Sequence, residues 1–217
     1  MSMRIGTWNL AGRWDIRHEQ LMLDQECDVW LLTEVSERLS LKDYRQRNTE
    51  ACMAPRRRWS AILSRKPIEA LPDPHPASAL VRIQDLHFCS SILPWRSCGR
   101  TFPWIGDKHA EKTRATLEQL MEVLPQCGLV WGGDWNHALS GSEYSGSKGG
   151  RAHLLKALET LQLKVPTADL LHRLPGCLSI DHIAVGQSIL IQSAERIDAS
   201  QDGQRLSDHD AYVLETA

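Results

Sequence analysis

The chain has 217 residues, of which 42% are hydrophobic and 24% are charged, values that are typical of one full-sized globular domain. No apolar run approaches the roughly 18 residues of a membrane-spanning helix, so we expect no membrane insertion. The formal net charge of -2 excludes a chain that is basic throughout, so a polyanionic partner would have to bind local basic patches.

Hydrophobic patterning predicts strands interleaved with a few helices. In chain order, we expect strands or helices over 3–9 (strand), 17–26 (helix), 28–34 (strand), 59–64 (strand), 79–93 (two strands), 107–124 (helix), 128–134 (strand), 151–163 (helix), 179–185 (strand), 189–198 (strand) and 210–215 (strand). Neighbouring strands within 79–93 and 179–198 indicate antiparallel pairing. The pattern favours a layered α/β protein, and because no linker divides it, we expect a single domain over 1–217 that is a monomer.

Three irregular stretches interrupt this pattern. They are "APRRRWS" (54–60), "PWRSCGRTFPWIGDK" (94–108) and "SGSEYSGSKGGR" (140–151). Loops that a rigid scaffold positions often carry function. We therefore expect these stretches to face the substrate.

The cysteines and the start of the chain bear on the compartment. Six cysteines are scattered without a CxxC pair, which favours reduced thiols over disulfides or zinc. The opening "MSMRIGTWNLAGRW" lacks a basic segment followed by an apolar stretch, so it does not resemble a secretory signal. We expect a cytoplasmic protein.

Several predicted strands end in an acidic or amide residue. These are Asn9, Glu34, Asp134 with Asn136, Asp181, and Asp208 with His209. One such residue would indicate only a turn, whereas this number suggests that strand ends converge on one cleft. Carboxylate and amide oxygens suit magnesium or manganese, and a magnesium phosphoesterase needs such ligands, a base for water and donors for phosphate oxygens.

The order of the motifs carries a resemblance. "TWNL", "LLTEV", "AILSRKPI", "WGGDWN", "SIDHI" and "LSDHD" resemble, in this order, the endonuclease/exonuclease/phosphatase superfamily, which has the pancreatic-type deoxyribonuclease fold. The similarity extends from about residue 4 to residue 213. It implies a four-layer α/β/β/α sandwich of two packed mixed sheets flanked by helices, with the site at one end, and a magnesium- or manganese-dependent phosphoric ester hydrolase.

The resemblance also implies metal ligands. Glu34 would be the principal ligand, Asn9 would help to organise the metal and phosphate site, and Asp208 would make a second metal contact, directly or through water. Members of the family often have an aspartate two residues after the asparagine, but position 11 is alanine here. This departure favours a site for one metal ion.

The resemblance also implies catalytic roles for four further residues. Asp134 would orient or deprotonate the attacking water, and Asn136 would donate to a phosphoryl oxygen. Asp181 would accept from one ring nitrogen of His209 and so fix its tautomer. His209 would either accept the proton of water or stabilise the pentacoordinate phosphate as an imidazolium. His182 is interpreted as structural, because strand alternation turns it away from Asp181.

Substrate contacts are expected from the basic and aromatic loop residues. The candidates are Trp95, Arg96, Arg100, Lys148 and Arg151. Many members of the family carry a phosphate-contacting His or Tyr near the end of the strand that falls at 86–93 here, but this chain has "SSIL" there. Basic side chains and aromatic faces suit a nuclease. The chain also lacks the "QETK"-like string of abasic-site endonucleases, which makes that activity a minor option.

Three alternatives to a nuclease stay open. The first is a phosphatase or phosphodiesterase that acts on a small molecule or a lipid. The second is a binding member of the family that does not catalyse. The third treats "DH" and "HD" as the ligands of a helical histidine-aspartate phosphohydrolase, although the surrounding residues read as strands.

Overall fold

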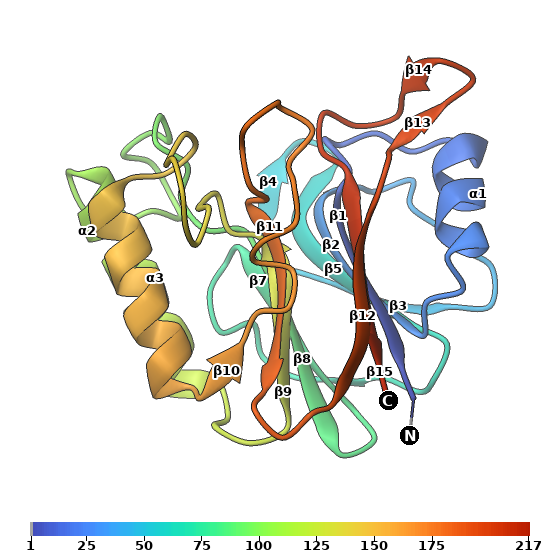
Figure 1. Cartoon of the computed structure of the whole chain (residues 1–217), viewed down its shortest axis with the longest axis horizontal. Coiled ribbons are helices and arrows are strands. Elements are labelled where there is room, and N and C mark those ends of the chain that lie inside the picture. Colours follow the sequence, from blue (N-terminus) through green and yellow to red (C-terminus); the bar gives the residue numbers. More distant parts are fainter. Residues whose placement is uncertain (1) are drawn as a thin grey trace.

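Two β-sheets pack face to face, and a helical layer covers the outer face of each (Figure 1). This arrangement comes from a computed structural model that describes residues 2–217. It confirms the predicted four-layer α/β sandwich. Helix α1 lies outside the first sheet, and helices α2 and α3 lie side by side outside the second.

The first sheet has seven strands in the order β12-β15-β1-β2-β5-β3, with β4 also paired to β5. Its strands are β1 (Arg4–Asn9), β2 (Val29–Ser36), β3 (Arg45–Asn48), β4 (Cys52–Ala54), β5 (Arg57–Ser64), β12 (Ile191–Ile197) and β15 (Ala211–Thr216). β1 and β2 are parallel, whereas β1 and β15 are antiparallel.

The second sheet has six strands in the order β10-β11-β9-β8-β7-β6. They are β6 (Glu69–Ala70), β7 (Ser78–Ile83), β8 (Leu86–Ser91), β9 (Leu129–Asp134), β10 (Leu163–Lys164) and β11 (Asp181–Gly186). β8 and β9 are parallel, and β9 and β11 are antiparallel. A separate hairpin joins β13 (Ser200–Gln201) to β14 (Gln204–Arg205).

The helices are α1 (Ile16–Asp24), α2 (His109–Val123) and α3 (Lys148–Thr160). Asp15 caps α1 by accepting from the backbone amides of Arg17 and His18, and Ser147 caps α3 by accepting from Gly150. Within residues 2–217, no helix has the length and apolar character that crossing a membrane requires.

The apolar core between the sheets holds the two layers together. Ile5 and Leu31 of the first sheet belong to the same buried cluster as Val130 and Ile183 of the second. A second cluster joins the outer face of β9 to α2 and α3. Both faces of β1, β2 and β9 are buried along most of their length, and each of these strands carries a polar site residue near its end.

The predicted long elements are all present. The antiparallel pairing expected within 79–93 is confirmed by β7 and β8, but the pairing expected within 179–198 was wrong, because β11 and β12 belong to different sheets.

The other differences concern short strands and loop boundaries. β3, β4, β6, β10, β13 and β14 were not expected from the sequence. They have two to four residues each and little apolar alternation. They form because they pair with a neighbouring strand, and not because they bury an apolar face. The expectation that 54–60 is irregular was wrong, because β4 ends at Ala54 and β5 already begins at Arg57. Likewise α3 begins at Lys148, inside the stretch expected to be a loop.

Candidate active site

Side chains from several strand ends meet at one end of the sandwich. β1 ends at Asn9, β9 ends at Asp134, β11 begins at Asp181, and His209 lies two residues before β15. The antiparallel register of β9 and β11 places Asp181 opposite Asp134. Asn9, Asp134 and Asp181 are all buried. The topology therefore gathers polar groups that lie up to 200 residues apart in the chain.

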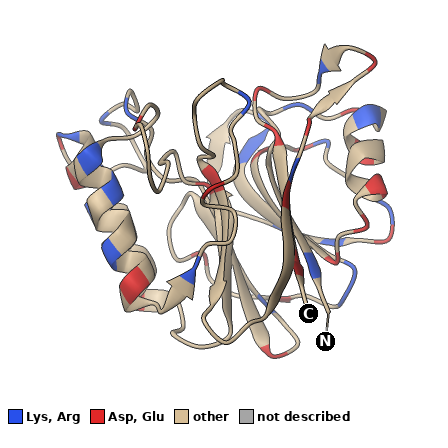
Figure 2. Ribbon diagram, viewed as in Figure 1, with Lys and Arg blue, Asp and Glu red and all other residues tan. Residues whose placement is uncertain are grey.

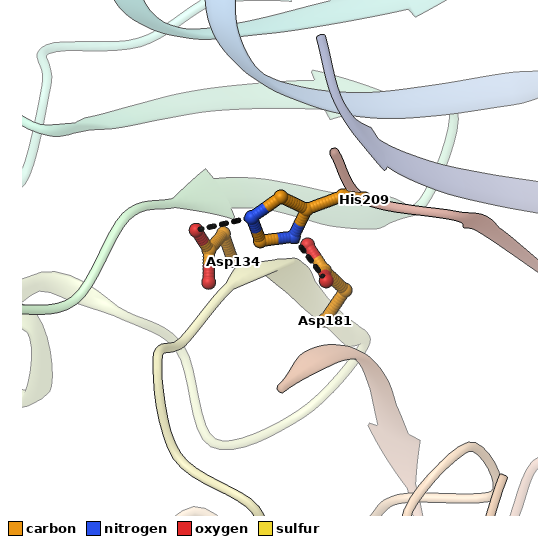
Figure 3. A group of neighbouring side chains, drawn as sticks. All are labelled: Asp134, Asp181 and His209. Atoms are coloured by element: carbon orange, nitrogen blue, oxygen red, sulfur yellow. Dashed lines mark hydrogen bonds and ion pairs between the residues drawn. The ribbon is translucent and has the colours of Figure 1, made fainter. Parts of the chain in front are cut away.

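The imidazole of His209 lies between two buried carboxylates (Figure 3). Its Nδ1 donates to Oδ2 of Asp181 at 2.7 Å, and its Nε2 lies 3.9 Å from Oδ2 of Asp134. Burial alone would lower the pKa of His209, but the charges of Asp181 and Asp134 raise this pKa well above the ordinary value of 6.5. Without a bound cation, the geometry thus favours the imidazolium form of His209.

Burial also raises the pKa of Asp134 above its ordinary value, and the charge of Asp181 adds to this effect. His209 and the Asn9 side chain act in the opposite direction, because both stabilise the carboxylate. A carboxylate whose pKa is raised in a cavity is a better proton acceptor than an ordinary surface aspartate.

Asn9 connects Asp134 to Glu34. Its Nδ2 donates to Oδ2 of Asp134 at 2.9 Å and to Oε1 of Glu34 at 3.2 Å. Its Oδ1, the atom that a metal ion would need, accepts from the backbone amide of Ala11 at 2.9 Å. In this structure Asn9 therefore orients two carboxylates, and its Oδ1 accepts from the backbone at Ala11.

Glu34 has an unusual backbone conformation for a strand residue. Its φ is +49°, in the left-handed region that costs a non-glycine residue about 1–3 kcal/mol. Its carbonyl accepts from the amide of Gly12 at 2.7 Å. Burial raises the pKa of the Glu34 carboxyl, and the hydrogen bond from Asn9 opposes that shift. Strain of this kind is common where a side chain must be aimed at a site.

Arg57 binds the second oxygen of Glu34. Its Nη1 lies 2.9 Å from Oε2 of Glu34, and the two side chains are 36% and 23% exposed. The sequence placed Arg57 in a basic stretch that we expected to face the substrate, and it gave no sign of the contact with Glu34. The signal that could have found it is the antiparallel pairing of β5 with β2, which places Arg57 opposite Ser36, two residues beyond Glu34.

The turn after β9 holds Asp134 and Asn136 in place. Oδ1 of Asp134 accepts from the backbone amide of Asn136 at 3.0 Å, and Nδ2 of Asn136 donates to the carbonyl of Leu93 at 3.1 Å. The next residue along from Asp134, Trp135, is fully buried. Gly133 has a φ of +125°, and a Cβ there would lie 2.2 Å from the carbonyl oxygen of Ser91. Only glycine fits this close approach between β8 and β9.

These side chains surround a cavity of about 180 Å³. Its seven lining residues are Glu34, Met53, Ile92, Trp95, Asp134, Asn136 and His209. Four of them are polar or ionisable, and the other three form an apolar wall. The cavity can therefore accept an anionic group against the polar side and an apolar or aromatic group against the wall.

The donor set fits a hard divalent cation. Asp134, Asp181 and His209 offer ligand atoms within 4.8 Å of one another, and the Glu34 carboxylate faces the same cavity. Oδ1 of Asp181 is buried, and among residues 2–217 it has no hydrogen-bond partner. Carboxylate oxygens are the ligands that magnesium and manganese prefer. Because His209 already uses Nδ1 to bind Asp181, the carboxylates are the more available donors.

The remaining predicted residues differ in whether they line the cavity. Trp95 lines the cavity. Asp208 is exposed and is not one of the seven lining residues. Arg96 donates to the carbonyls of Gly146 and Glu143, and Arg151 pairs with Glu143 at 3.2 Å, so both arginines brace the loop that precedes α3.

Arg100 and Lys148 are exposed at the surface. Arg100 makes only a 3.5 Å ion pair with Asp107, in which both side chains are 75% exposed. Of the basic residues expected to contact substrate, these two are the ones whose side chains the structure leaves available.

Ser207 is a site residue that the sequence did not single out. Its hydroxyl donates to the carbonyl of Asn9 at 2.6 Å and accepts from the amide of His209 at 3.1 Å. It thereby joins the end of β1 to the segment that carries His209. Its place directly before the "DH" pair was the only sequence signal.

Comparisons with known proteins agree with this geometry. The endonuclease domain of TRAS1, a telomere-specific non-LTR retrotransposon, has a TM-score of 0.72 and 16% identity over 100% of this chain and 98% of its own. The 3' phosphatase NExo from Neisseria, bound to a product DNA hairpin, has a TM-score of 0.74 and 15% identity over 99% of both chains. An AP endonuclease from Archaeoglobus fulgidus has a TM-score of 0.73 and 17% identity over 98% of both chains.

These identities establish the fold alone, and a search of curated proteins gave no significant match. The sequence model of the Endonuclease/Exonuclease/phosphatase family, however, matches residues 6–209, which is nearly the whole chain. The predicted resemblance is thus confirmed, and the chain belongs to the endonuclease/exonuclease/phosphatase family.

Proposed function

We propose that this phosphoric ester hydrolase is a phosphodiesterase that depends on magnesium or manganese and cleaves DNA or RNA. The observation that carries the proposal is the array of Asp181, His209 and Asp134 beside the cavity that Glu34 and Asn136 also line. An array of carboxylate, imidazole and carboxylate can hold and move a proton at the point where water attacks a phosphoester.

Asp134 is the residue that orients the attacking water and accepts its proton. Its carboxylate is fixed by Asn9 and by the backbone amide of Asn136, and burial raises its pKa. Asn136 has a second amide hydrogen beyond the one that Leu93 accepts, and this hydrogen is available to a phosphoryl oxygen in the cavity.

His209 supplies positive charge next to the reacting phosphate. Asp181 accepts from Nδ1, which leaves Nε2 directed toward Asp134 and the cavity. As an imidazolium, this ring stabilises the charge that develops on phosphate oxygens, and it can return a proton to the leaving group.

Glu34 is the principal ligand for the metal ion, with Asp134 and Asp208 as further candidates. When bound, the ion would act as a Lewis acid that neutralises phosphate charge and lowers the pKa of water. Glu34 suits this role because its carboxylate faces the cavity, whereas the exposed Asp208 would contribute through water.

A nucleic-acid substrate is supported by the neighbours and by the cavity wall. All three structures named above are described as endonucleases or as a phosphatase bound to DNA. Trp95 lines the cavity next to Met53 and Ile92, so a base or sugar can pack there while the phosphate faces the polar side. Arg100 and Lys148 are exposed and available to phosphates farther along a strand.

A small phosphodiester is the second candidate, and the charge distribution favours it. Arg96 and Arg151 are bound to the loop that precedes α3, and Figure 2 shows basic residues on α1, α3 and several loops. Nucleic-acid binding proteins usually show a basic stripe. The cavity of about 180 Å³ also suits a compact ligand.

The test is a substrate panel. Single-stranded DNA, double-stranded DNA, RNA and bis(p-nitrophenyl) phosphate are incubated with magnesium or manganese, with Asp134→Asn, and with the matched control His153→Gln on α3. We expect metal-dependent cleavage of at least one polynucleotide by the wild type and the control, and loss in Asp134→Asn. Cleavage of only the small diester would move the function to the second candidate, and metal-dependent hydrolysis of none would refute both.

A further inference from the structure

Arg57 binds Glu34, the expected metal ligand, next to the cavity. Its positive charge would repel a cation bound there. It lies in β5, outside every motif that the family resemblance matched. Its ion pair with Glu34 has a distance of 2.9 Å, and Glu34 Oε1 is left to Asn9 at 3.2 Å. One oxygen of the carboxylate thus faces a guanidinium and the other faces a neutral amide.

The loop after β1 is shaped to admit this guanidinium. A Cβ at Gly12 would lie 2.2 Å from Nε, 2.3 Å from Nη2 and 2.4 Å from Cζ of Arg57. Gly12 also has a φ of +69°, and its amide donates to the Glu34 carbonyl at 2.7 Å. Gly12 therefore supports Glu34 through the backbone and leaves room for Arg57 above it.

The residue at position 11 affects how the charge of Arg57 is balanced. Position 11 is alanine, so no carboxylate follows Asn9 to neutralise Arg57 or to bind a second metal ion. Among residues 2–217, Glu34 is the carboxylate that pairs with Arg57, and that pair is only partly exposed. A charge pair in such a setting has a stronger mutual influence than a fully solvated one.

We propose that Arg57 is a positioning residue that acts through Glu34: it holds Oε2, leaves Oε1 to the metal ion, and thereby weakens the binding of that ion. The inference rests on the proposed function insofar as Glu34 is the metal ligand. A residue with a merely structural role would, when removed, leave metal affinity unchanged or lower it. For Arg57 we expect the opposite, namely a higher metal affinity when it is removed, because its removal frees the second oxygen of Glu34 and deletes a repelling charge.

The experiment measures Mn²⁺ binding to the full chain by counting free Mn²⁺ with electron paramagnetic resonance, in the absence of substrate. We expect Arg57→Ala to bind Mn²⁺ at least about fivefold more tightly, because the substitution frees Oε2 of Glu34 for the ion and removes a positive charge close to a divalent cation. Arg57→Lys restores the charge and should stay within about twofold of wild type. Arg58→Ala is the matched control, because Arg58 pairs with Glu37 at 3.2 Å.

A double-mutant cycle shows whether Arg57 acts through Glu34. In a Glu34→Gln background no carboxylate oxygen is freed and only the direct repulsion remains, so we expect Arg57→Ala to change Mn²⁺ affinity by a clearly smaller factor than in wild type. An effect that persists at full size would overturn the positioning role, and so would Arg57→Ala binding Mn²⁺ no more tightly than wild type, or a wild type that binds no Mn²⁺. Failure of the proposed function has a separate signature, because it appears as absent hydrolysis in the substrate panel whatever the Mn²⁺ affinities are.

Discussion

Oδ2 of Asp181 and Nδ1 of His209 lie 2.7 Å apart, and the Asp181 side chain is fully shielded from solvent. A buried carboxylate at this distance fixes the imidazole tautomer and holds Nε2 toward Asp134. The two residues are in contact although they lie 28 positions apart in the sequence. Asp181 begins β11 of the second sheet, and His209 lies two residues before the start of β15 in the first sheet.

Asp181→Asn should therefore impair catalysis more than substrate binding. The amide has the same shape but cannot hold the proton at Nδ1, so we expect kcat to fall by about 10²- to 10⁴-fold with KM changed by less than about threefold. Steady-state kinetics on the best substrate of the panel measure both constants. A drop in kcat/KM that arises from KM alone would mean that Asp181 serves substrate binding instead.

The same pair should make the stability of the metal-free protein depend on pH. The folded-state pKa of His209 is raised above its value in the unfolded chain, so its stabilising contribution is complete below about pH 6.5 and is lost as the pH rises through the folded-state pKa. We expect the difference in unfolding free energy between wild type and His209→Gln to be largest near pH 6 and to shrink at alkaline pH. Urea unfolding in EDTA measures it, and a difference that grows with pH would contradict the assignment.

Gly133→Ala should destabilise the fold at the site. The added Cβ would lie 2.2 Å from the carbonyl oxygen of Ser91, and the φ of +125° is strained for alanine. Together these effects cost about 3 kcal/mol or more in unfolding free energy. Gly141→Ala is the control, since its φ is +63° but its nearest contact is an ordinary 3.6 Å. Equal losses in the two variants would show that backbone strain alone matters.

Lys148→Ala and Arg96→Ala should differ if the substrate is a polynucleotide. Lys148 is exposed, so its loss should weaken oligonucleotide binding and reduce the salt slope by about 1. Arg96 holds the carbonyls of Gly146 and Glu143, so its loss should lower the unfolding temperature and leave the salt slope unchanged. Binding of a labelled oligonucleotide to Asp134→Asn at several salt concentrations separates the two. A Lys148→Ala slope equal to that of the parent would contradict the nucleic-acid reading at this loop.

The long elements of the fold were predictable because their burial leaves a strong periodic signal. β2 and β9 contain apolar runs that are buried on both faces, and α2 and α3 carry leucines on one face, so these patterns can be recognised without any tertiary information. β3 could not be predicted, since its sequence "RQRN" is polar and it exists only through pairing with β5. Its position reflects a partner that is distant in sequence.

The residue types at the strand ends were visible in the sequence, but their contacts were not. Asn9 was expected to help organise the metal and phosphate site, but the sequence did not reveal that its nitrogen bridges two carboxylates and that its oxygen accepts from the Ala11 amide. The basic loop residues looked equivalent, yet Arg96 and Arg151 brace a loop while Lys148 stays exposed. Such distinctions depend on loop geometry, which the hydrophobic pattern does not encode.

The most direct test of the central claim is the rate of phosphodiester hydrolysis before and after metal removal, in wild type and in Asp134→Asn. Activity on the best substrate of the panel is measured in EDTA, then with magnesium or manganese restored. We predict that wild type is inactive in EDTA and recovers with the metal, whereas Asp134→Asn, with or without the metal, stays at least about 10²-fold slower than wild type with the metal. Full wild-type activity in EDTA, or an Asp134→Asn rate equal to that of wild type with metal, would contradict a metal-assisted reaction at this site.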